Sequence, residues 1–179
     1  MSSDQQTKPT PPWEQRVIAW ADERRILDGS TCWNQYGKLV EELAELLTAI
    51  AEEDAGELQD AIGDCAVVLT VIACQRGLDN ETCKGKFIAA SSFAERSTIA
   101  RERYTVPSLA EAIGKLADGI TKNQQQKIVL AIGEAWYCLA RIGEQWHLPL
   151  PECQEAAWEE IKDRRGVCIG GVFVKEESL

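Results

Sequence analysis

Residues 41–64 read EELAELLTAIAEEDAGELQDAIGD, two apolar, helix-periodic segments joined by a short acidic turn, each with an acidic cluster. Residues three or four apart share one face of a helix, so Glu42 lies beside Glu45. Asp60 lies beside Asp64 for the same reason. Folded as a helical hairpin, the two segments would bring four carboxylates together, where their mutual repulsion favours a bound cation. Oxygen ligands suit Mg²⁺ or Mn²⁺, so the pattern indicates phosphate chemistry first.

The competing interpretation is that these acids only solvate an exposed helix, as most acidic runs do. Apolar residues on both sides of the acids indicate instead that some of the carboxylates face another helix. These apolar residues are Leu43, Leu46, Leu47, Ile50, Ile62, Val67, Val68 and Leu69. The pattern alone leaves both interpretations open.

The chain contains an internal repeat. A shift of 70 residues aligns 41–83 with 111–153 without a gap, and 11 of the 43 positions are identical. We interpret this as duplication of a helical hairpin, with shared amphipathic periodicity as the alternative. The acids differ: Glu42, Glu45, Asp60 and Asp64 align with Ala112, Lys115, Leu130 and Glu134. The sequence therefore predicts a catalytic hairpin over 41–83 and a degenerate, scaffolding repeat over 111–153.

Composition limits the classes of function. With 179 residues and 45% hydrophobic content the chain can bury the core of one domain. The net charge of −10 disfavours binding to nucleic acid or to an anionic membrane. The sequence has no apolar run of membrane-spanning length and no export signal, so we expect a soluble, cytoplasmic protein.

The predicted fold class is all-α, a helical bundle with a duplicated hairpin and a short C-terminal β-hairpin. We expect a disordered tail over 1–12 and one domain over 13–179, of which 154–179 forms a phosphate-binding helix and β tail. Helices are expected over 13–27, 34–51, 57–76 and from 79–81 to about 100, with a turn at 28–30 and a linker at 104–108. Thr31 and the stretch 79–81 are predicted helix caps, and Ser108 with Glu111 is predicted to open the next helix as a capping box. The repeat's second helix should end near 146, the last helix should run from 149–151 to 164, and a β-hairpin should follow over 166–174.

Four motifs in this order give the chain a resemblance to a known family. They are QYGKLVEELAE at 35–45, DAIGD at 60–64, EIKDRRG at 160–166 and GVFVK at 171–175. The chain resembles MazG-like nucleoside triphosphate pyrophosphohydrolases of the phage type. The resemblance implies an all-α pyrophosphatase that uses two or more Mg²⁺ or Mn²⁺ ions to hydrolyse an NTP or dNTP to the monophosphate and pyrophosphate. It also implies a role in nucleotide-pool control, with a purine dNTP such as dGTP as the expected substrate.

The resemblance assigns metal binding to Glu42, Glu45 and Asp64. Relatives often carry ExxD in the second motif, but Ala61 holds the first position of that pattern here. Asp60 is the expected substitute on the same face, and Glu57 is the alternative fourth ligand.

The implied reaction is in-line attack of water on the α-phosphorus, with Glu41 or Glu45 helping to take its proton. Phosphate contacts are expected from Lys38, Lys162 and Arg165, for which surface solubilisation is the alternative. Base contacts are expected from Trp33 and Gln35, and core packing is the alternative for Trp33. Glu159 stands where relatives often have Asn, so that contact is altered or lost.

Two other classes compete with this interpretation. A di-iron carboxylate bundle normally needs Glu-x-x-His pairs, whereas the single His147 is remote from the acids and has an expected structural role. A catalytically silent oligomerisation or adaptor module is the more serious alternative. We expect a homodimer or homotetramer, since single-hairpin relatives assemble their four-helix core between subunits.

Overall fold

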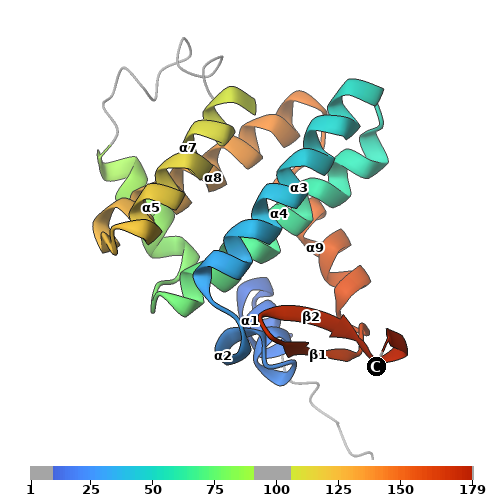
Figure 1. The fold of residues 1–179 in the computed structure, drawn as a ribbon. Coiled ribbons are helices and arrows are strands. Elements are labelled where there is room, and N and C mark those ends of the chain that lie inside the picture. Colours follow the sequence, from blue (N-terminus) through green and yellow to red (C-terminus); the bar gives the residue numbers. More distant parts are fainter. Residues whose placement is uncertain (1–9, 91–105, 179) are drawn as a thin grey trace, which may run out of the picture.

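The computed structural model describes residues 10–90 and 106–178. Within these ranges, eight α-helices surround a common core and a two-stranded sheet closes one end (Figure 1). The helices are α1 (Trp13–Glu23), α2 (Ile26–Gly29), α3 (Cys32–Glu52), α4 (Ala55–Gln75), α5 (Asn80–Ala90), α7 (Val106–Thr121), α8 (Gln125–Gln145) and α9 (Leu150–Ile161). Strands β1 (Gly166–Ile169) and β2 (Val172–Lys175) pair antiparallel, and the 3-10 turn η1 (Glu176–Ser178) follows. The predicted all-α fold class is confirmed.

Helices α3 and α4 form the acidic hairpin. Thr31 caps α3 as predicted, because its side chain accepts the N–H of Asn34 while the Asn34 side chain accepts the N–H of Thr31. Glu53 ends α3 in the left-handed conformation with φ 56°, and the Asp54 carboxylate then accepts two N–H groups from the first turn of α4. Helix α4 is buried along most of its length and supplies the centre of the core.

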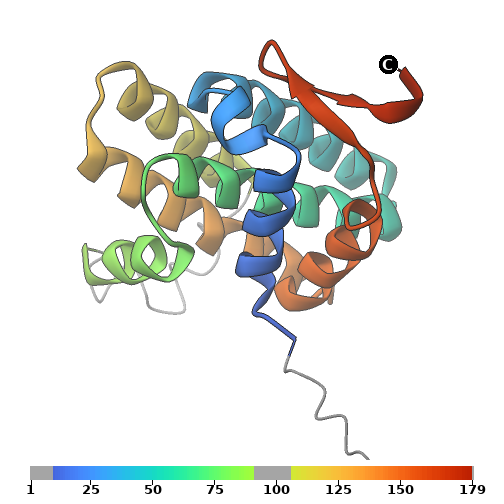
Figure 2. The same cartoon turned by 90° about the horizontal axis from the view of Figure 1, so that it is seen from below.

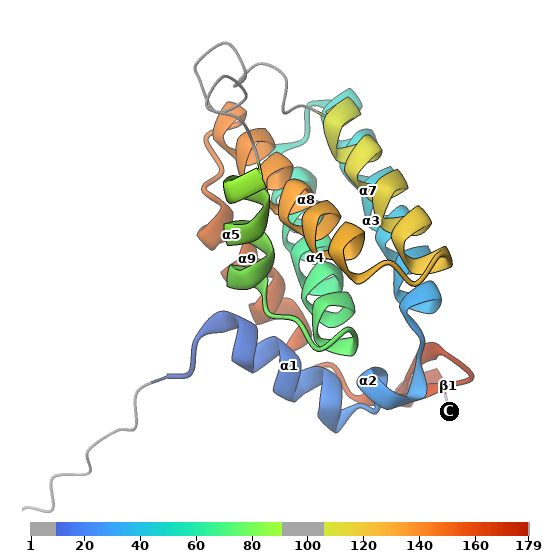
Figure 3. The same cartoon turned by 90° about the vertical axis from the view of Figure 1, so that its left-hand side faces the viewer.

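The second hairpin, α7 and α8, repeats the first with exchanged partners. Helix α8 spans 125–145, 70 residues after the 55–75 of α4. Helix α9 packs on α4 while α5 packs on α8 (Figure 3). A Cβ on Gly63 of α4 would lie 2.4 Å from the Cys153 carbonyl oxygen of α9, and a Cβ on Gly133 of α8 would lie 2.3 Å from the Cys83 carbonyl oxygen of α5. The contacts are thus reciprocal, because the helix that follows each hairpin packs on the second helix of the other hairpin.

A second, smaller core attaches α1 and the sheet to the bundle. Its buried residues are Val17, Trp20, Ala21, Ile26, Val67, Val71, Ala157 and Ile161. Phe173 of β2 packs against Trp20 with ring centroids 6.0 Å apart. The β-hairpin and α1 therefore lie at the same end of the α3–α4 hairpin (Figure 2).

Several predicted boundaries were wrong. The first helix ends at Glu23 rather than at 27, because Arg25 adopts a left-handed φ of 60°, and the predicted turn at 28–30 overlaps the short helix α2. The capping box at Ser108 was wrong because α7 already begins at Val106, with Pro107 in its first turn. Helix α9 ends at Ile161 rather than at 164.

Other expectations concern residues outside the described ranges or membrane insertion. The tail over 1–9 and the segment 91–105, with the end of the helix that begins at 80, lie outside the described residues. The predicted cap at Asp79 is confirmed, since its carboxylate accepts the N–H of Thr82. In the described ranges no single helix is long and apolar enough to span a membrane, and only α4 with α5, a pair bent by 94°, meets the length and composition test jointly.

Candidate active site

A cavity of about 460 Å³ lies where α3 and α4 meet the β-hairpin and the end of α9. Its charged and amide-bearing lining residues are Asn34, Gln35, Lys38, Glu41, Glu42, Asp64, Arg164 and Lys175. Its large apolar lining residues are Trp20, Ile26, Val67, Val68, Val71, Ile161, Val172 and Phe173. Asp64 and Val71 are seven residues apart on α4, about 10 Å along its axis. The cavity wall therefore changes from acidic to apolar along the helix.

Glu42 is the buried acid of this cavity, with 2% of its surface exposed. Its Oε1 lies 2.8 Å from Lys38 Nζ, one turn earlier on α3, and Lys38 Nζ also lies 3.1 Å from Glu41 Oε2. The Oε2 atom of Glu42 is buried and has no hydrogen-bond partner among the described residues. Burial raises the pKa of Glu42, with a further contribution from Glu45, while Lys38 opposes the rise. Burial opposes the charge on Lys38, but its bonds to the two acids outweigh this effect and raise the pKa of Lys38.

Asp64 of α4 completes the centre of the acidic cluster. Burial raises its pKa to about 7, and the charges of Glu42 and then Asp60 add to the effect. The four acids of the two motifs are thus electrostatically connected, because Glu45 acts on Glu42 and Asp60 acts on Asp64. No three acidic, thiol or imidazole side chains in the described ranges already form a ready-made metal site. The donors nevertheless fit a hard divalent cation, since they are all carboxylate oxygens and one buried oxygen of Glu42 lacks a partner.

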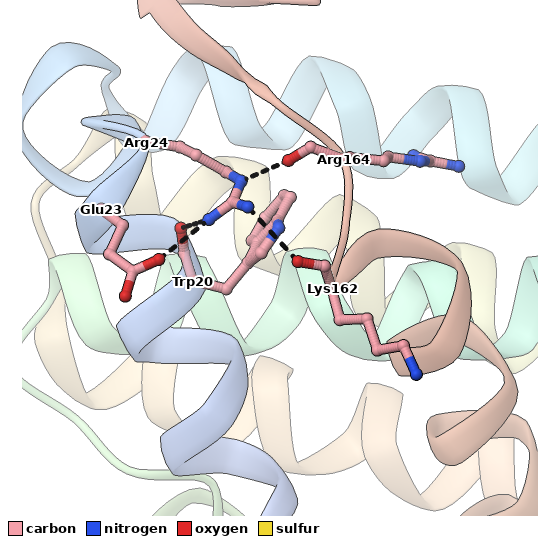
Figure 4. Close-up of polar contacts among 5 residues, drawn as sticks. All are labelled: Trp20, Glu23, Arg24, Lys162 and Arg164. Carbon is pink, nitrogen blue, oxygen red and sulfur yellow. Dashed lines mark hydrogen bonds and ion pairs between the residues drawn. The ribbon is translucent and has the colours of Figure 1, made fainter.

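Arg164 supplies positive charge to the cavity from the segment that follows α9. It lines the cavity, its charge lowers the pKa of Asp64, and it forms an ion pair with Glu160. Arg24 of the α1–α2 link fixes this segment, as Figure 4 shows: its Nε donates to the Arg164 carbonyl oxygen at 2.7 Å and its Nη2 to that of Lys162 at 3.4 Å. The guanidinium also lies 5.0 Å from the centre of the Trp20 ring. Arg24 therefore ties the end of α9 to the wall of the cavity.

Some predicted site residues line this cavity and others lie beside it. Glu41, Glu42, Asp64, Gln35 and Lys38 are lining residues. Glu45, Asp60, Trp33, Lys162 and Arg165 are not.

The predicted residues outside the cavity have other surroundings. Trp33 is 47% exposed and packs edge to face on Tyr36 at 5.3 Å, while Lys162 forms an ion pair with Glu159. Arg165 lines a neighbouring groove with Arg164 and Lys175. Glu57, the alternative fourth ligand, is exposed in the first turn of α4.

Trp20, Phe173, Arg164 and Lys175 line the cavity but were not among the site residues predicted from the sequence. Trp20 was interpreted only as part of an amphipathic helix, and the run at 164–165 did not reveal which arginine turns inward. The RRG turn followed by a strand was the available signal, because it predicts that the chain folds back after α9.

Comparison with known proteins agrees with this geometry. Residues 1–90, which include the acidic hairpin, match the model of the phosphoribosyl-ATP pyrophosphohydrolase family. The chain is also 28% identical over 154 residues to an uncharacterized 18.2 kDa protein of Haemophilus phage HP1 (strain HP1c1), a match that covers 79% of this chain and 93% of that protein. No solved structure matches the chain. The chain belongs to the phosphoribosyl-ATP pyrophosphohydrolase family, a pyrophosphohydrolase family related to the MazG-like enzymes that its acidic motifs resemble.

Proposed function

We propose that the protein is a metal-dependent nucleoside triphosphate pyrophosphohydrolase that converts a (d)NTP and water to the (d)NMP and pyrophosphate. The observation that carries the proposal is the position of Glu42, a buried carboxylate with one unpartnered oxygen, in a cavity that also holds Asp64, Lys38 and Arg164. The second oxygen of this buried carboxylate has no partner among the described residues, and a cation brought in with a polyphosphate would supply one.

Glu42, Glu45, Asp60 and Asp64 are the proposed ligands of Mg²⁺ or Mn²⁺, with two or more ions per site. When bound, the ions would neutralise the phosphate oxygens and lower the pKa of the attacking water. Glu42 and Asp64 line the cavity, and the charges of Glu45 and Asp60 act on these two acids, which supports assigning all four to one site.

The remaining chemistry is assigned to side chains of the chain itself. Water attacks the α-phosphorus, its oxygen forms the new P–O bond, and its proton passes to Glu41 or Glu45. The bond from the α-phosphorus to the bridging oxygen breaks, and the leaving group departs as pyrophosphate. Lys38 and Arg164 line the cavity and are the proposed contacts of the phosphate oxygens, with Lys162 and Arg165 as further proposed contacts on either side of Arg164 in the chain.

The apolar part of the cavity is the proposed base site. Trp20, Val71 and Phe173 form an apolar part of the cavity lining, in which Val71 lies about 10 Å from Asp64 along α4, and Gln35 adds an amide. Gln35 Nε2 donates to Ser30 Oγ at 2.9 Å, which orients that amide. Trp33 would contact a base only at the outer rim, because it is not among the cavity residues. A purine deoxynucleotide, with dGTP as the first candidate, suits the large apolar wall.

The cellular setting is proposed from the comparisons and the surface. The similarity to a phage protein supports a setting in the cytoplasm of a phage host, and the resemblance of the acidic motifs to MazG-like enzymes supports a role in nucleotide-pool control. The net charge of −10 supports a small-molecule substrate rather than a nucleic acid or membrane partner. Trp33, Val40 and Leu47 are exposed at intervals of seven along α3, which supports a homodimer or homotetramer that buries this stripe. Light scattering on the protein as it elutes from a size-exclusion column would measure its mass and so its oligomeric state.

The proposal is tested by incubating the protein with each common dNTP and NTP and with phosphoribosyl-ATP, in Mg²⁺, in Mn²⁺ and in EDTA. We expect monophosphate and pyrophosphate in equal amounts, only with metal, and fastest from a purine dNTP. If the protein hydrolysed only phosphoribosyl-ATP, its substrate would be the one in the name of its family, and the dNTP assignment would be overturned. No release from any compound would favour a silent adaptor module.

A further inference from the structure

The second hairpin retains part of the acidic constellation in a changed form. Under the 70-residue shift, Glu41 corresponds to Glu111 and Asp64 corresponds to Glu134, so two carboxylates persist. Glu42 corresponds to the buried Ala112 and Asp60 to Leu130. Glu45 corresponds to Lys115, which reverses the charge at that position.

Lys115 occupies the centre of the remaining acids. Its Nζ lies 2.9 Å from Glu134 Oε2 and 3.0 Å from Glu134 Oε1, across the hairpin on α8. It also lies 3.0 Å from Glu111 Oε1, one turn earlier on α7. One ammonium therefore bridges carboxylates from both helices of the repeat.

The two hairpins differ in how their acids are satisfied. In the first, Lys38 bonds one oxygen of the buried Glu42 and leaves the other without a partner among the described residues. In the second, both oxygens of Glu134, whose side chain is 15% exposed, are bonded to Lys115. The second site is neutralised by the chain itself, whereas the first has an oxygen left for a cation.

We infer that the Lys115 ammonium is a built-in cation that replaces the divalent metal in the second hairpin, and that removing it opens a latent divalent-cation site between α7 and α8. The comparison rests on the proposed metal site of the first hairpin. Replacing Lys115 by Glu would leave carboxylates at positions 111, 115 and 134, which correspond to Glu41, Glu45 and Asp64 of the first repeat, where we propose that Mg²⁺ or Mn²⁺ relieves the repulsion. The unaltered chain accordingly holds metal at one hairpin only.

Binding of Mn²⁺ to the full chain tests this inference. The first hairpin is silenced by Glu42→Gln with Asp64→Asn, and Lys115→Glu is added to that background. Lys86→Glu, on the exposed face of α5, gives the same change in charge and serves as the matched control. Bound Mn²⁺ is measured by the loss of the electron paramagnetic resonance signal of the free ion. Thermal unfolding is followed with Mn²⁺ and with EDTA.

We expect the silenced chain and the Lys86→Glu control to bind no Mn²⁺, and Lys115→Glu to bind about one ion per chain. Lys115→Glu should unfold at a lower temperature in EDTA and recover about 3–8 °C with excess Mn²⁺. Mn²⁺ binding no greater than in the control would overturn the inference.

A second set of variants serves if Lys115→Glu does not fold. With the first hairpin intact, Lys115→Met should lower the midpoint of unfolding in EDTA by about 3–8 °C, and Lys115→Arg should restore most of that loss. A Lys115→Met variant with the same midpoint temperature of unfolding as the unaltered protein would contradict a neutralising role for Lys115. Metal binding by the unaltered chain reports on the first hairpin. The proposed function can therefore fail while the inference about Lys115 holds, and the two failures can be told apart.

Discussion

Lys38 Nζ lies 2.8 Å from Glu42 Oε1, so a lysine one helical turn away partly neutralises the carboxylate that the fold buries most deeply at this site. Lys38 opposes the rise in the pKa of Glu42 that burial causes, and the second carboxylate oxygen of Glu42 has no hydrogen-bond partner among the described residues. A metal ion with its polyphosphate can bind to a site prepared in this way without first displacing an internal ion pair from that oxygen.

Lys38→Met should therefore weaken catalysis. A hydrogen bond to a charged group contributes about 1.5–3 kcal/mol, so kcat/KM should fall about 10- to 100-fold. Steady-state pyrophosphate release measures the effect, and Lys86→Met on α5 is the control. Equal kcat/KM values for Lys38→Met and Lys86→Met would show that Lys38 does not contribute to the site.

The pKa of Asp64 predicts a pH dependence of stability in the metal-free protein. Its ordinary pKa is 3.8, whereas burial and neighbouring charges raise it to about 7 in the folded state. Between these values the folded chain holds a proton that the unfolded chain has released, so the free energy of unfolding decreases as the pH rises. Denaturant unfolding in EDTA from about pH 4 to about pH 8 should show this decrease, and Asp64→Asn should flatten it. An identical pH dependence in Asp64→Asn would contradict the assignment.

Gly63→Ala should destabilise the protein, because the added Cβ would lie 2.4 Å from the Cys153 carbonyl oxygen of α9. Overpacking of this kind costs about 1–3 kcal/mol, and a backbone contact leaves little room for relief. Gly114→Ala on α7 is the matched control, since a Cβ there has nothing within 4 Å and should stabilise the helix by about 0.5–1 kcal/mol. Chemical denaturation compares the two, and equal stability would refute the close helix contact.

Arg24 should act through Arg164. Its Nε donates to the Arg164 carbonyl oxygen at 2.7 Å, so Arg24→Met frees the segment that carries the inward-facing arginine. We expect KM for the triphosphate to rise about tenfold with a smaller change in kcat. In Arg164→Met the added Arg24→Met should have little further effect on KM, whereas independent contacts would give multiplicative losses.

The parts of the molecule set by local interactions were predictable from the sequence. The α3–α4 hairpin follows from its helical periodicity and from the cap at Thr31, and the acids of the two motifs lie on facing helices as expected. The fold class followed from the same periodicity. These features need only neighbouring residues to form.

The parts set by tertiary contacts were not predictable. Helix α9 ends before residue 164, where Arg24 binds the carbonyl groups that follow it, and α1 contributes Trp20 to the cavity through its contact with Phe173. The sequence could not distinguish Trp20 from Trp33 as the aromatic of the cavity, because both lie in amphipathic segments. Packing between elements far apart in the chain decides between them.

We propose one metal-dependent site per chain, in the first hairpin, that hydrolyses the triphosphate. Its most direct test compares pyrophosphate release by Glu42→Gln with release by Glu134→Gln, the acid of the second hairpin bound by Lys115. We predict that Glu42→Gln loses at least about 100-fold in kcat while Glu134→Gln stays within about threefold of the unaltered protein. Full activity in Glu42→Gln, or a comparable loss in both variants, would contradict the assignment of the active site to the first hairpin alone.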